Sequence, residues 1–144
     1  MTSHRLSEPE IWAFIGSEPP HTGKLATVRA DGAPHVAPVW FALDDETLVF
    51  TTGADTVKGR TLRRQGRAAL CVDDERPPFT FALVCGPVEI TEDPTSLRRW
   101  AGVIGGRYLG PERASEMAAR NGGPGELLVR LLPQKMTSMA DLSD

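Results

Sequence analysis

Residues 23–74 read GKLATVRADGAPHVAPVWFALDDETLVFTTGADTVKGRTLRRQGRAALCVDD, and this stretch decides the fold. Its Asp31-Gly32 dipeptide favours the positive φ angles of a tight hairpin turn. The flanking segments Lys24–Arg29 and Pro34–Leu43 are therefore predicted to pair as antiparallel strands, and Thr47–Thr52 is predicted to form a third strand. The stretch indicates a β-rich unit built from local antiparallel pairing.

The rest of the chain continues this β-rich order with few helices. Apolar and β-branched runs predict further strands over Ala68–Val72, Phe79–Ile90 and Glu126–Leu132. Capping residues, prolines and glycines predict helices after Ser7, over Thr56–Gln65 with Gly66 as its end, from Pro94 to Val103 or Ile104, and over Pro111–Arg120. Six strands with helices outside them favour a mainly β chain, a single domain over residues 1–144, and a small antiparallel barrel. Because such a barrel has a filled interior, its ligand is expected at a rim, in a groove or between subunits.

The composition argues against several classes of protein. A net charge of −3 does not suit a nucleic-acid binder, since affinity for a phosphate backbone needs a broad basic surface. No apolar run approaches the roughly 20 residues of a membrane span, and no signal-like segment opens the chain, so a cytoplasmic protein is expected. Cys71 and Cys85 lie in apolar runs and are predicted to be buried, reduced thiols. The three histidines are scattered without metal-ligand spacing, so no metal is predicted.

Residues 51–67 have the composition of a phosphate site. Thr51 and Thr52 offer hydroxyl groups at a strand end, and Asp55 is predicted to cap the helix that follows. The start of that helix presents backbone N–H groups and one ammonium group, which come from Thr56, Val57 and Lys58. The alternative is an ordinary solvated helix face, because the five cations from Lys58 to Arg67 need no ligand.

The ordered motifs between about residues 22 and 90 resemble the pyridoxamine 5′-phosphate oxidase-like split-barrel superfamily, in particular its actinobacterial branch that uses the deazaflavin coenzyme F420. The motifs that carry the resemblance are Leu25-Ala26-Thr27, Asp31-Gly32, Pro34-His35-Val36, Pro38-Val39-Trp40-Phe41, Thr51-Thr52, Lys58, Leu62-Arg63-Arg64 and Arg67. The resemblance implies a six-stranded antiparallel split β-barrel of the FMN-binding type. It also implies a homodimer that holds a cofactor in each of two grooves between its subunits.

The resemblance further implies where the cofactor lies. Its phosphate would lie at Thr51, Thr52, Thr56 and Lys58, with Val57 beside the lysine. The second strand would run beneath the ring and would place three residues there, His35, Val39 and Trp40. Arg60 would reach an acidic tail. Two alternatives stay open, because His35 can be structural and Trp40 can fill the dimer core.

The implied activity is hydride transfer from reduced F420 to an electron-poor or conjugated small organic molecule. No catalytic residue is predicted, because the cofactor carries the chemistry and the completing proton can come from water, His35 or Tyr108. Pyridoxine phosphate is not expected as the substrate. Val39-Trp40-Phe41 stands where true pyridoxamine phosphate oxidases have a cationic pair, and the chain ends QKMTSMADLSD rather than in an Arg-rich tail.

Three alternative functions share this fold. An FMN-dependent oxidase or reductase is the first, although Val57 stands where the FMN enzymes place an arginine. A non-catalytic flavin or F420 binder is the second, and it would have the same anion site. A ligand-free barrel is the third, and it would use the cationic helix as a docking face.

Overall fold

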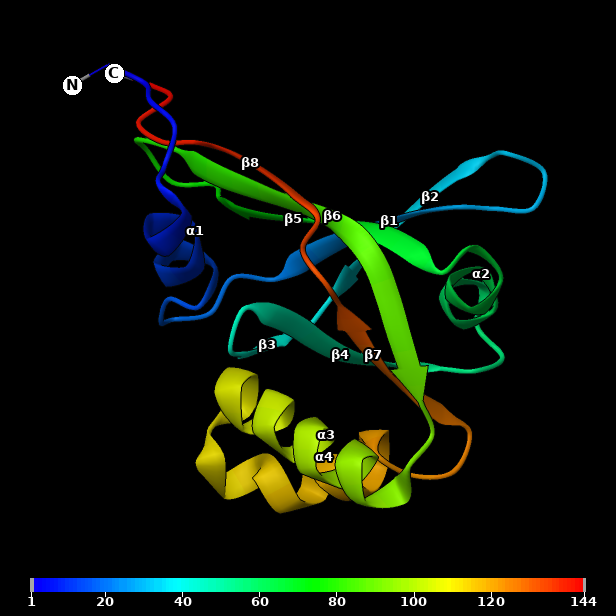
Figure 1. Ribbon diagram of the computed structural model, residues 1–144. Coiled ribbons are helices and arrows are strands. Elements are labelled where there is room, and N and C mark those ends of the chain that lie inside the picture. Colours follow the sequence, from blue (N-terminus) through cyan, green and yellow to red (C-terminus); the bar gives the residue numbers. More distant parts are fainter. Residues whose placement is uncertain (1, 144) are drawn as a thin grey trace.

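The computed structural model describes residues 2–143 and places eight strands in one antiparallel sheet (Figure 1). The strands are β1 (Gly23–Val28), β2 (Pro34–Val39), β3 (Ala42–Asp44), β4 (Thr47–Gly53), β5 (Arg67–Asp74), β6 (Thr80–Thr91), β7 (Glu126–Leu131) and β8 (Lys135–Met139). The helices are α1 (Glu8–Ile15), α2 (Val57–Gln65), α3 (Pro94–Leu109) and α4 (Ala114–Asn121), with a short 3-10 helix over Pro111–Arg113. The mainly β class that the sequence predicted is confirmed.

The sheet curls into a half-barrel because its longest strand belongs to both halves. Neighbouring strands follow the order β2-β1-β5-β6-β7-β4-β3, and β8 pairs with β6 off this path. The first part of β6 pairs with β5, while its last four residues, Val88–Thr91, pair with β7. Gly86 lies near the end of the first part, where a Cβ atom would come within 1.9 Å of the Leu132 carbonyl oxygen. Only glycine permits this close approach, so Gly86 allows the strand to pass from one half to the other.

Eight strands replace the six that the sequence predicted. The predicted strand over residues 34–43 is interrupted between β2 and β3, where side chains of α3 bond the backbone of Phe41. Its N–H donates to the Tyr108 hydroxyl at 3.4 Å, and its carbonyl accepts from Arg107 at 2.6 Å. The last strand, β8, was not predicted because its sequence KMTSM has only one β-branched residue, and it depends on pairing with β6.

Local signals predicted the hairpin turn and two helix boundaries correctly. Gly32 has a φ of 87°, and the Asp31 carboxylate supports the turn by accepting from the Ala33 N–H at 2.9 Å. The capping box that begins α1 is present, and Gly66 ends α2 with a φ of 66°. Turn and cap residues whose partners lie within four positions along the chain were therefore sufficient to predict these boundaries.

The predicted cap of α2 was wrong by one residue. The helix begins at Val57, and the residue before it, Thr56, is the N-cap rather than Asp55. The Thr56 hydroxyl accepts from the Gly59 N–H at 3.0 Å and donates to the Gly53 carbonyl at 2.7 Å. The first bond caps α2, and the second joins the helix start to the end of β4.

The third helix extends further than its predicted end at residue 103 or 104. Gly105 does not break it, because a Cβ atom there would overlap Met117 of α4, and the missing side chain lets the two helices pack closely. Tyr108 therefore belongs to a helix and not to a loop. None of the helices within residues 2–143 combines the length and apolar character needed to cross a membrane.

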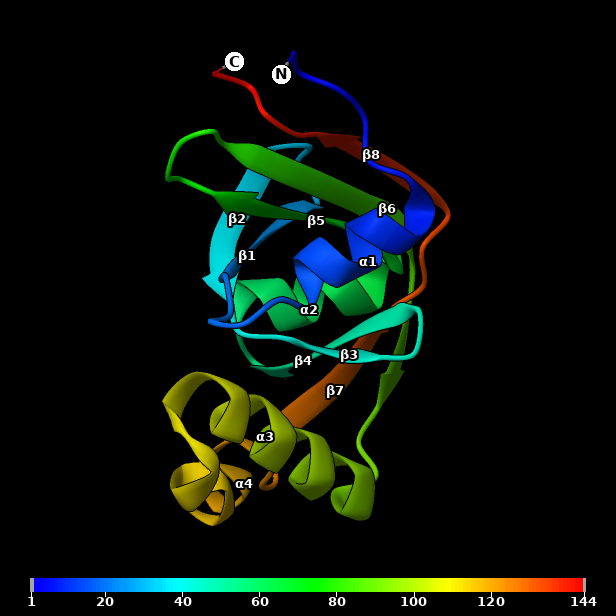
Figure 2. The same cartoon turned by 90° about the vertical axis from the view of Figure 1, so that its left-hand side faces the viewer.

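Two apolar clusters hold the helices in place. The main core fills the half-barrel, where Ile15 of α1 and Leu62 of α2 pack with Phe50 of β4. The second cluster lies under α3, where Trp100 packs on Val49 from the opposite face of β4. Figure 2 shows the result, with α1 and α2 among the strands and the α3–α4 pair beneath β4 and β7. The end of β4 is thus surrounded by α2 on one side and α3–α4 on the other.

The predicted burial of the cysteines was wrong. Cys71 and Cys85 are free thiols, and both are only half-buried. They lie on strand positions that alternate with the buried residues Leu70, Val72 and Val84, so they point to the outer face of β5 and β6. That outer face is apolar, which is why the sequence alone suggested burial.

Candidate anion site

A pocket of about 310 Å³ opens where β4 ends. Its walls come from the end of β2, from β4, α2, α3, α4 and the start of β7. The lining residues are Pro38, Val39, Trp40, Thr51, Lys58, Ile104, Asn121 and Glu126. We call this the Lys58 pocket. Four of the nine predicted cofactor-binding residues line it, namely Val39, Trp40, Thr51 and Lys58.

The start of α2 gives the pocket its donors. A Cβ atom at Gly59 would lie 2.2 Å from the Gly53 carbonyl oxygen, so glycine lets the first turn rest directly on the strand end. The Thr56 cap satisfies the N–H of Gly59, whereas the N–H groups of Val57 and Lys58 precede the first intrahelical bonds. These two N–H groups and the Lys58 ammonium form a concentration of positive charge at the helix start.

The two strand-end threonines have different roles. Successive strand residues point to opposite faces, so Thr51 lines the Lys58 pocket while Thr52 is buried on the other side. The Thr52 hydroxyl lies 3.3 Å from the hydroxyl of Thr56, which is itself engaged in capping. Thr52 and Thr56 therefore order the helix start, and a direct contact of either residue with a ligand stays a prediction.

Trp40 forms an exposed aromatic wall that α3 fixes in place. Its indole stacks on the Tyr108 ring with centroids 5.1 Å apart and an interplanar angle of 6°. The Tyr108 hydroxyl donates to the His21 carbonyl at 2.7 Å, and burial raises the pKa of this phenol above its usual value. Because its only proton is engaged with the backbone, the structure gives Tyr108 a positioning role rather than that of the proton donor considered above.

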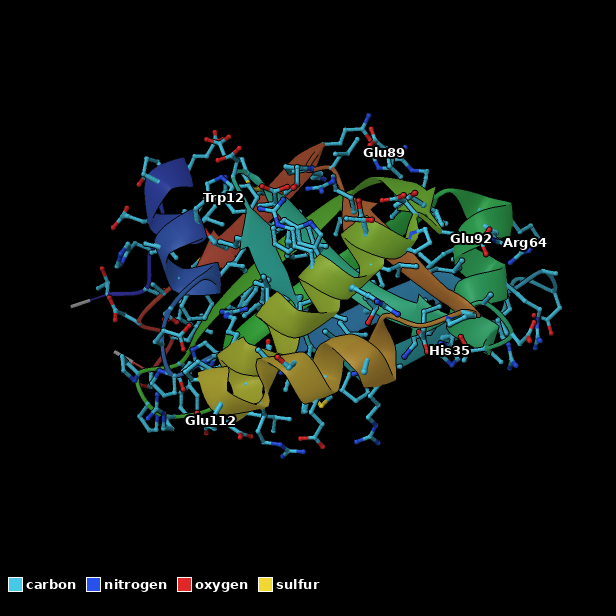
Figure 3. The ribbon with its side chains drawn as sticks, turned by 90° about the horizontal axis from the view of Figure 1, so that it is seen from below. Trp12, His35, Arg64, Glu89, Glu92 and Glu112 are labelled. Atoms are coloured by element: carbon cyan, nitrogen blue, oxygen red, sulfur yellow. The ribbon has the colours of Figure 1, made fainter. Side chains whose placement is uncertain are left out.

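Of the five predicted residues outside the pocket lining, His35 and Arg60 are the two that do not belong to the strand end or the helix start described above. His35, labelled in Figure 3, projects from β2 with its Nδ1 atom buried and without a hydrogen-bond partner among residues 2–143. Its cross-strand neighbour Thr27 has a buried hydroxyl that is equally unpaired within that range. Arg60 is exposed, and its guanidinium donates to the Asp55 carbonyl at 2.7 Å. Their roles toward a cofactor stay predictions.

The sequence did not reveal two polar residues of the pocket, Asn121 and Glu126. Asn121 ends α4, and Glu126 starts β7 opposite Gly53 of β4. Burial raises the pKa of the Glu126 carboxyl above its usual value, and the nearby Lys58 ammonium offsets this in part. The only sequence signal was their position on either side of the Gly122–Gly125 loop, and that signal does not show which strand β7 pairs with.

A larger cavity of about 510 Å³ lies elsewhere, between residues 19–24 and the end of β5. Its charged side chains are mostly paired with one another. Lys24 bonds Asp73 at 2.6 Å, and Arg76 bonds Asp74 at 3.1 Å. Because these charges are already balanced, the smaller Lys58 pocket is the better candidate for an anionic ligand.

The chain matches the pyridoxamine 5′-phosphate oxidase family over residues 7–139, and it belongs to that family. A curated relative, the pyridoxine/pyridoxamine 5′-phosphate oxidase of Rhizobium johnstonii, is 40% identical over 91 residues. That alignment covers 61% of this chain and 41% of the relative. The chain thus spans less than half the length of the curated relatives it matches.

Solved structures share the whole fold. A conserved hypothetical protein from Mycobacterium tuberculosis is 29% identical, with a TM-score of 0.82 over 96% of this chain and 87% of that chain. An F420 reductase is also 29% identical, with a TM-score of 0.62 over 86% of this chain and 93% of that chain. The predicted resemblance to the split-barrel superfamily is confirmed, and the fold is that of its flavin-type oxidoreductases.

Proposed function

We propose that this protein is an oxidoreductase that uses coenzyme F420 to reduce an electron-poor or conjugated small organic molecule. The observation that carries the proposal is the Lys58 pocket, which brings a strand-end hydroxyl, a lysine and a helix start beside an exposed indole. The F420 reductase among the structural relatives supports the choice of cofactor.

The residues present fit a phosphorylated deazaflavin. The Thr51 hydroxyl, the Lys58 ammonium and the N–H groups of Val57 and Lys58 would hold the phosphate with charge-assisted bonds and without a metal. Val39 and Trp40 would form an apolar surface for the ring. When bound, the cofactor supplies the hydride, and the protein's part is to orient it and to exclude water.

A homodimer is part of this proposal, because one face of the sheet is apolar and exposed. Val36 on β2 is 67% exposed. It heads a row of cross-strand neighbours that continues through Ala26, Ala69 and Cys85. Pro38 continues the same face of β2 to the rim of the Lys58 pocket. A second copy of this chain on this face would hide the apolar surface and close the pocket, whose volume is near the lower end of the usual range for ligand sites.

An FMN-dependent oxidase or reductase is the second candidate, favoured by the curated oxidase among the relatives. The pocket has one cation, Lys58, and the neighbouring helix position is Val57. A non-catalytic binder would share this site, and a substrate screen for turnover with reduced F420 distinguishes it from an enzyme.

The deciding experiment titrates the protein with F420 and with FMN in parallel, using intrinsic tryptophan fluorescence. We expect F420 to bind at about micromolar concentration or tighter, and Lys58→Ala to weaken it about tenfold or more because a charge-assisted contact is lost. Lys135→Ala removes an exposed lysine on β8 and is the matched control. Preference for FMN would establish the second candidate, and binding of neither ligand would reject both.

A further inference from the structure

A second cavity meets the Lys58 pocket at Glu126. It has a volume of about 460 Å³ and lies between the start of α3 and the Gly122–Gly125 loop. Glu126 lines both cavities, and no other residue does. We call the second one the glycine-loop cavity. The two cavities are therefore adjacent at Glu126.

The Lys58 pocket is lined by one charged side chain of each sign. Lys58 is its one cationic side chain, and Glu126 is its one carboxyl group. A phosphate monoester carries about −1.5 to −2 charges at pH 7, because its second pKa is near 6. A phosphodiester has no second proton to lose and stays at one negative charge. Because Coulomb energy scales with charge, the ionised Glu126 carboxylate repels a monoester more strongly than a diester.

The glycine-loop cavity has the chemistry to receive a second ester arm. Pro94, Leu97 and Pro124 give it apolar walls, and Arg98 gives it a cation. Arg98 forms no ion pair or hydrogen bond within residues 2–143, whereas Glu92, which also lines this cavity, is paired with Arg63 at 3.0 Å. Figure 3 shows Glu92 beside α2, which agrees with this pairing. The cation that is free to meet a ligand in this cavity is therefore Arg98.

The loop itself leaves room for a ligand. A Cβ atom at Gly125 would meet no heavy atom within 4 Å, and one at Gly123 would meet only the Ala119 carbonyl oxygen at 3.6 Å. Gly122 is instead packed against α3, because a Cβ atom there would lie 2.8 Å from the Arg98 Cα atom, so the uncovered part of the loop is residues 123–125. A chain of atoms that leaves the phosphate past Glu126 can lie along it.

We propose that the Lys58 pocket and the glycine-loop cavity together select a phosphodiester cofactor. Its phosphate lies at Lys58, and its second ester arm lies along the Gly122–Gly125 loop. Glu126 is the residue that disfavours a monoester. This inference rests on the proposed function and deepens it, because it gives a physical reason for F420, a phosphodiester with an acidic tail, to be preferred over FMN, a monoester.

The first test keeps the ring constant and changes only the ester. Binding of FMN and of riboflavin 5′-(methyl phosphate) is measured by tryptophan fluorescence near pH 7.5. We expect the methyl diester to bind about tenfold tighter than FMN, and Glu126→Gln to reduce this ratio to about threefold or less by strengthening FMN binding. Glu89→Gln, at an exposed carboxyl of β6 that lines neither cavity, is the control and should leave the ratio unchanged.

The second test concerns the tail. Arg98→Gln should weaken F420 about fivefold without affecting the methyl diester, because only F420 has a tail that reaches Arg98. Arg99→Gln is the matched control, since Arg99 is the next residue but borders a different cavity on the α4 side of α3.

The outcomes separate the two proposals. The inference is overturned if F420 and both flavins bind with no preference for the methyl diester over FMN. It is also overturned if Glu126→Gln leaves the ratio of the two flavin affinities unchanged. Either result leaves the proposed function standing. Equal effects of Arg98→Gln and Arg99→Gln on F420 overturn the assignment of the tail to the glycine-loop cavity. Binding of none of the three ligands overturns the proposed function itself.

Discussion

At Gly59 the absence of a side chain lets the first turn of α2 lie against the end of β4. Any larger residue would have to push the Gly53 and Ala54 carbonyls away, because a Cβ atom would lie 2.2 Å and 3.1 Å from their oxygens. The position of the Val57 and Lys58 N–H groups depends on this contact. Gly59 therefore determines both the close packing of α2 on β4 and the position of the two N–H groups at the Lys58 pocket.

We expect Gly59→Ala to lower the free energy of unfolding by about 2 kcal/mol or more, because backbone atoms and not a flexible side chain must move. Urea denaturation measures the change, and F420 titration should show weaker binding as well. Gly106→Ala in α3 is the control, because its Cβ atom would make only an ordinary contact, at 3.5 Å from the Cβ atom of Ala114 in α4. There we expect no loss, or a gain of up to about 1 kcal/mol from helix propensity.

A second prediction at the residue scale concerns Glu126 and the pH dependence of stability. Burial raises the pKa of its carboxyl in the folded state above the unfolded value, so the folded state holds the proton more tightly. The resulting stabilisation is complete below the unfolded pKa and is lost as pH rises through the folded pKa. Glu126→Gln, which stays neutral, should therefore gain melting temperature relative to the wild type as the pH rises above the unfolded glutamate pKa of about 4.3.

Thermal melts of both proteins at a series of pH values check the prediction. Because Glu89 is exposed, the Glu89→Gln variant should lack the pH-dependent difference. Parallel melting curves for Glu126→Gln and the wild type at all pH values would contradict the burial of the Glu126 carboxyl.

At the scale of elements, α3 is attached to the rest of the molecule by the side chain of Arg107. Its guanidinium donates to the Phe41 carbonyl at 2.6 Å and to the Ile15 carbonyl at 3.1 Å, and it lies 4.8 Å from the Phe41 ring centroid. One residue thus joins α3 to the end of α1 and to the junction of β2 and β3. The position of Trp40 in that junction follows from these bonds.

Arg107→Gln should lower the free energy of unfolding by about 2–3 kcal/mol, because shortening this side chain leaves buried carbonyls without a charged donor. The side chain of Arg107 is only 10% exposed, so water does not easily replace the lost donors. Arg113→Gln, which removes an exposed pair with Glu116, should have little effect on the urea midpoint. Equal effects of the two substitutions would contradict this role of Arg107.

The same elements show what sequence can and cannot predict. Asp31-Gly32, Gly66 and the Ser7 capping box act on neighbours within a few residues, and all three were predicted correctly. The break after β2 depends on bonds from α3 that come 66 and 67 residues later in the chain. Local periodicity contains no information about such partners, so residues 34–43 were predicted as one strand.

The residues of the candidate site also differ in whether the local sequence could predict them. Thr51 and Lys58 belong to one strand–turn–helix segment, and their common position was predictable from that segment. Glu126 and Asn121 enter the pocket only because β7 pairs with β4 and α4 packs on α3. Which strands pair is decided by the burial of whole apolar faces, and a single sequence does not specify that choice.

At the scale of the whole molecule, the apolar outer face of β1, β2, β5 and β6 predicts self-association. Val36→Asp would place a charge at its most exposed apolar position and should convert a dimer into monomers. Sedimentation velocity measures the change, and F420 binding should weaken with it if the partner closes the pocket. Val103→Asp is the control, because Val103 is 45% exposed on α3 and lies outside that face.

A wild-type protein that sediments as a monomer at micromolar concentration would contradict this prediction. Equal dissociation by the Val36 and Val103 substitutions would contradict the assignment of the interface to this face of the sheet. Retained secondary structure in both variants, measured by circular dichroism, shows that a change in association is not caused by unfolding.

The long strand β6 has one further consequence. Because its first part completes the sheet with β5 and β8 while its last four residues complete the sheet with β7, neither half has a full set of backbone partners without the other. The chain therefore offers no point between β5 and β7 at which two autonomous folding units separate. Denaturation should proceed as one cooperative transition, in which the end of the sheet at the Lys58 pocket and the distant end lose their amide protection together.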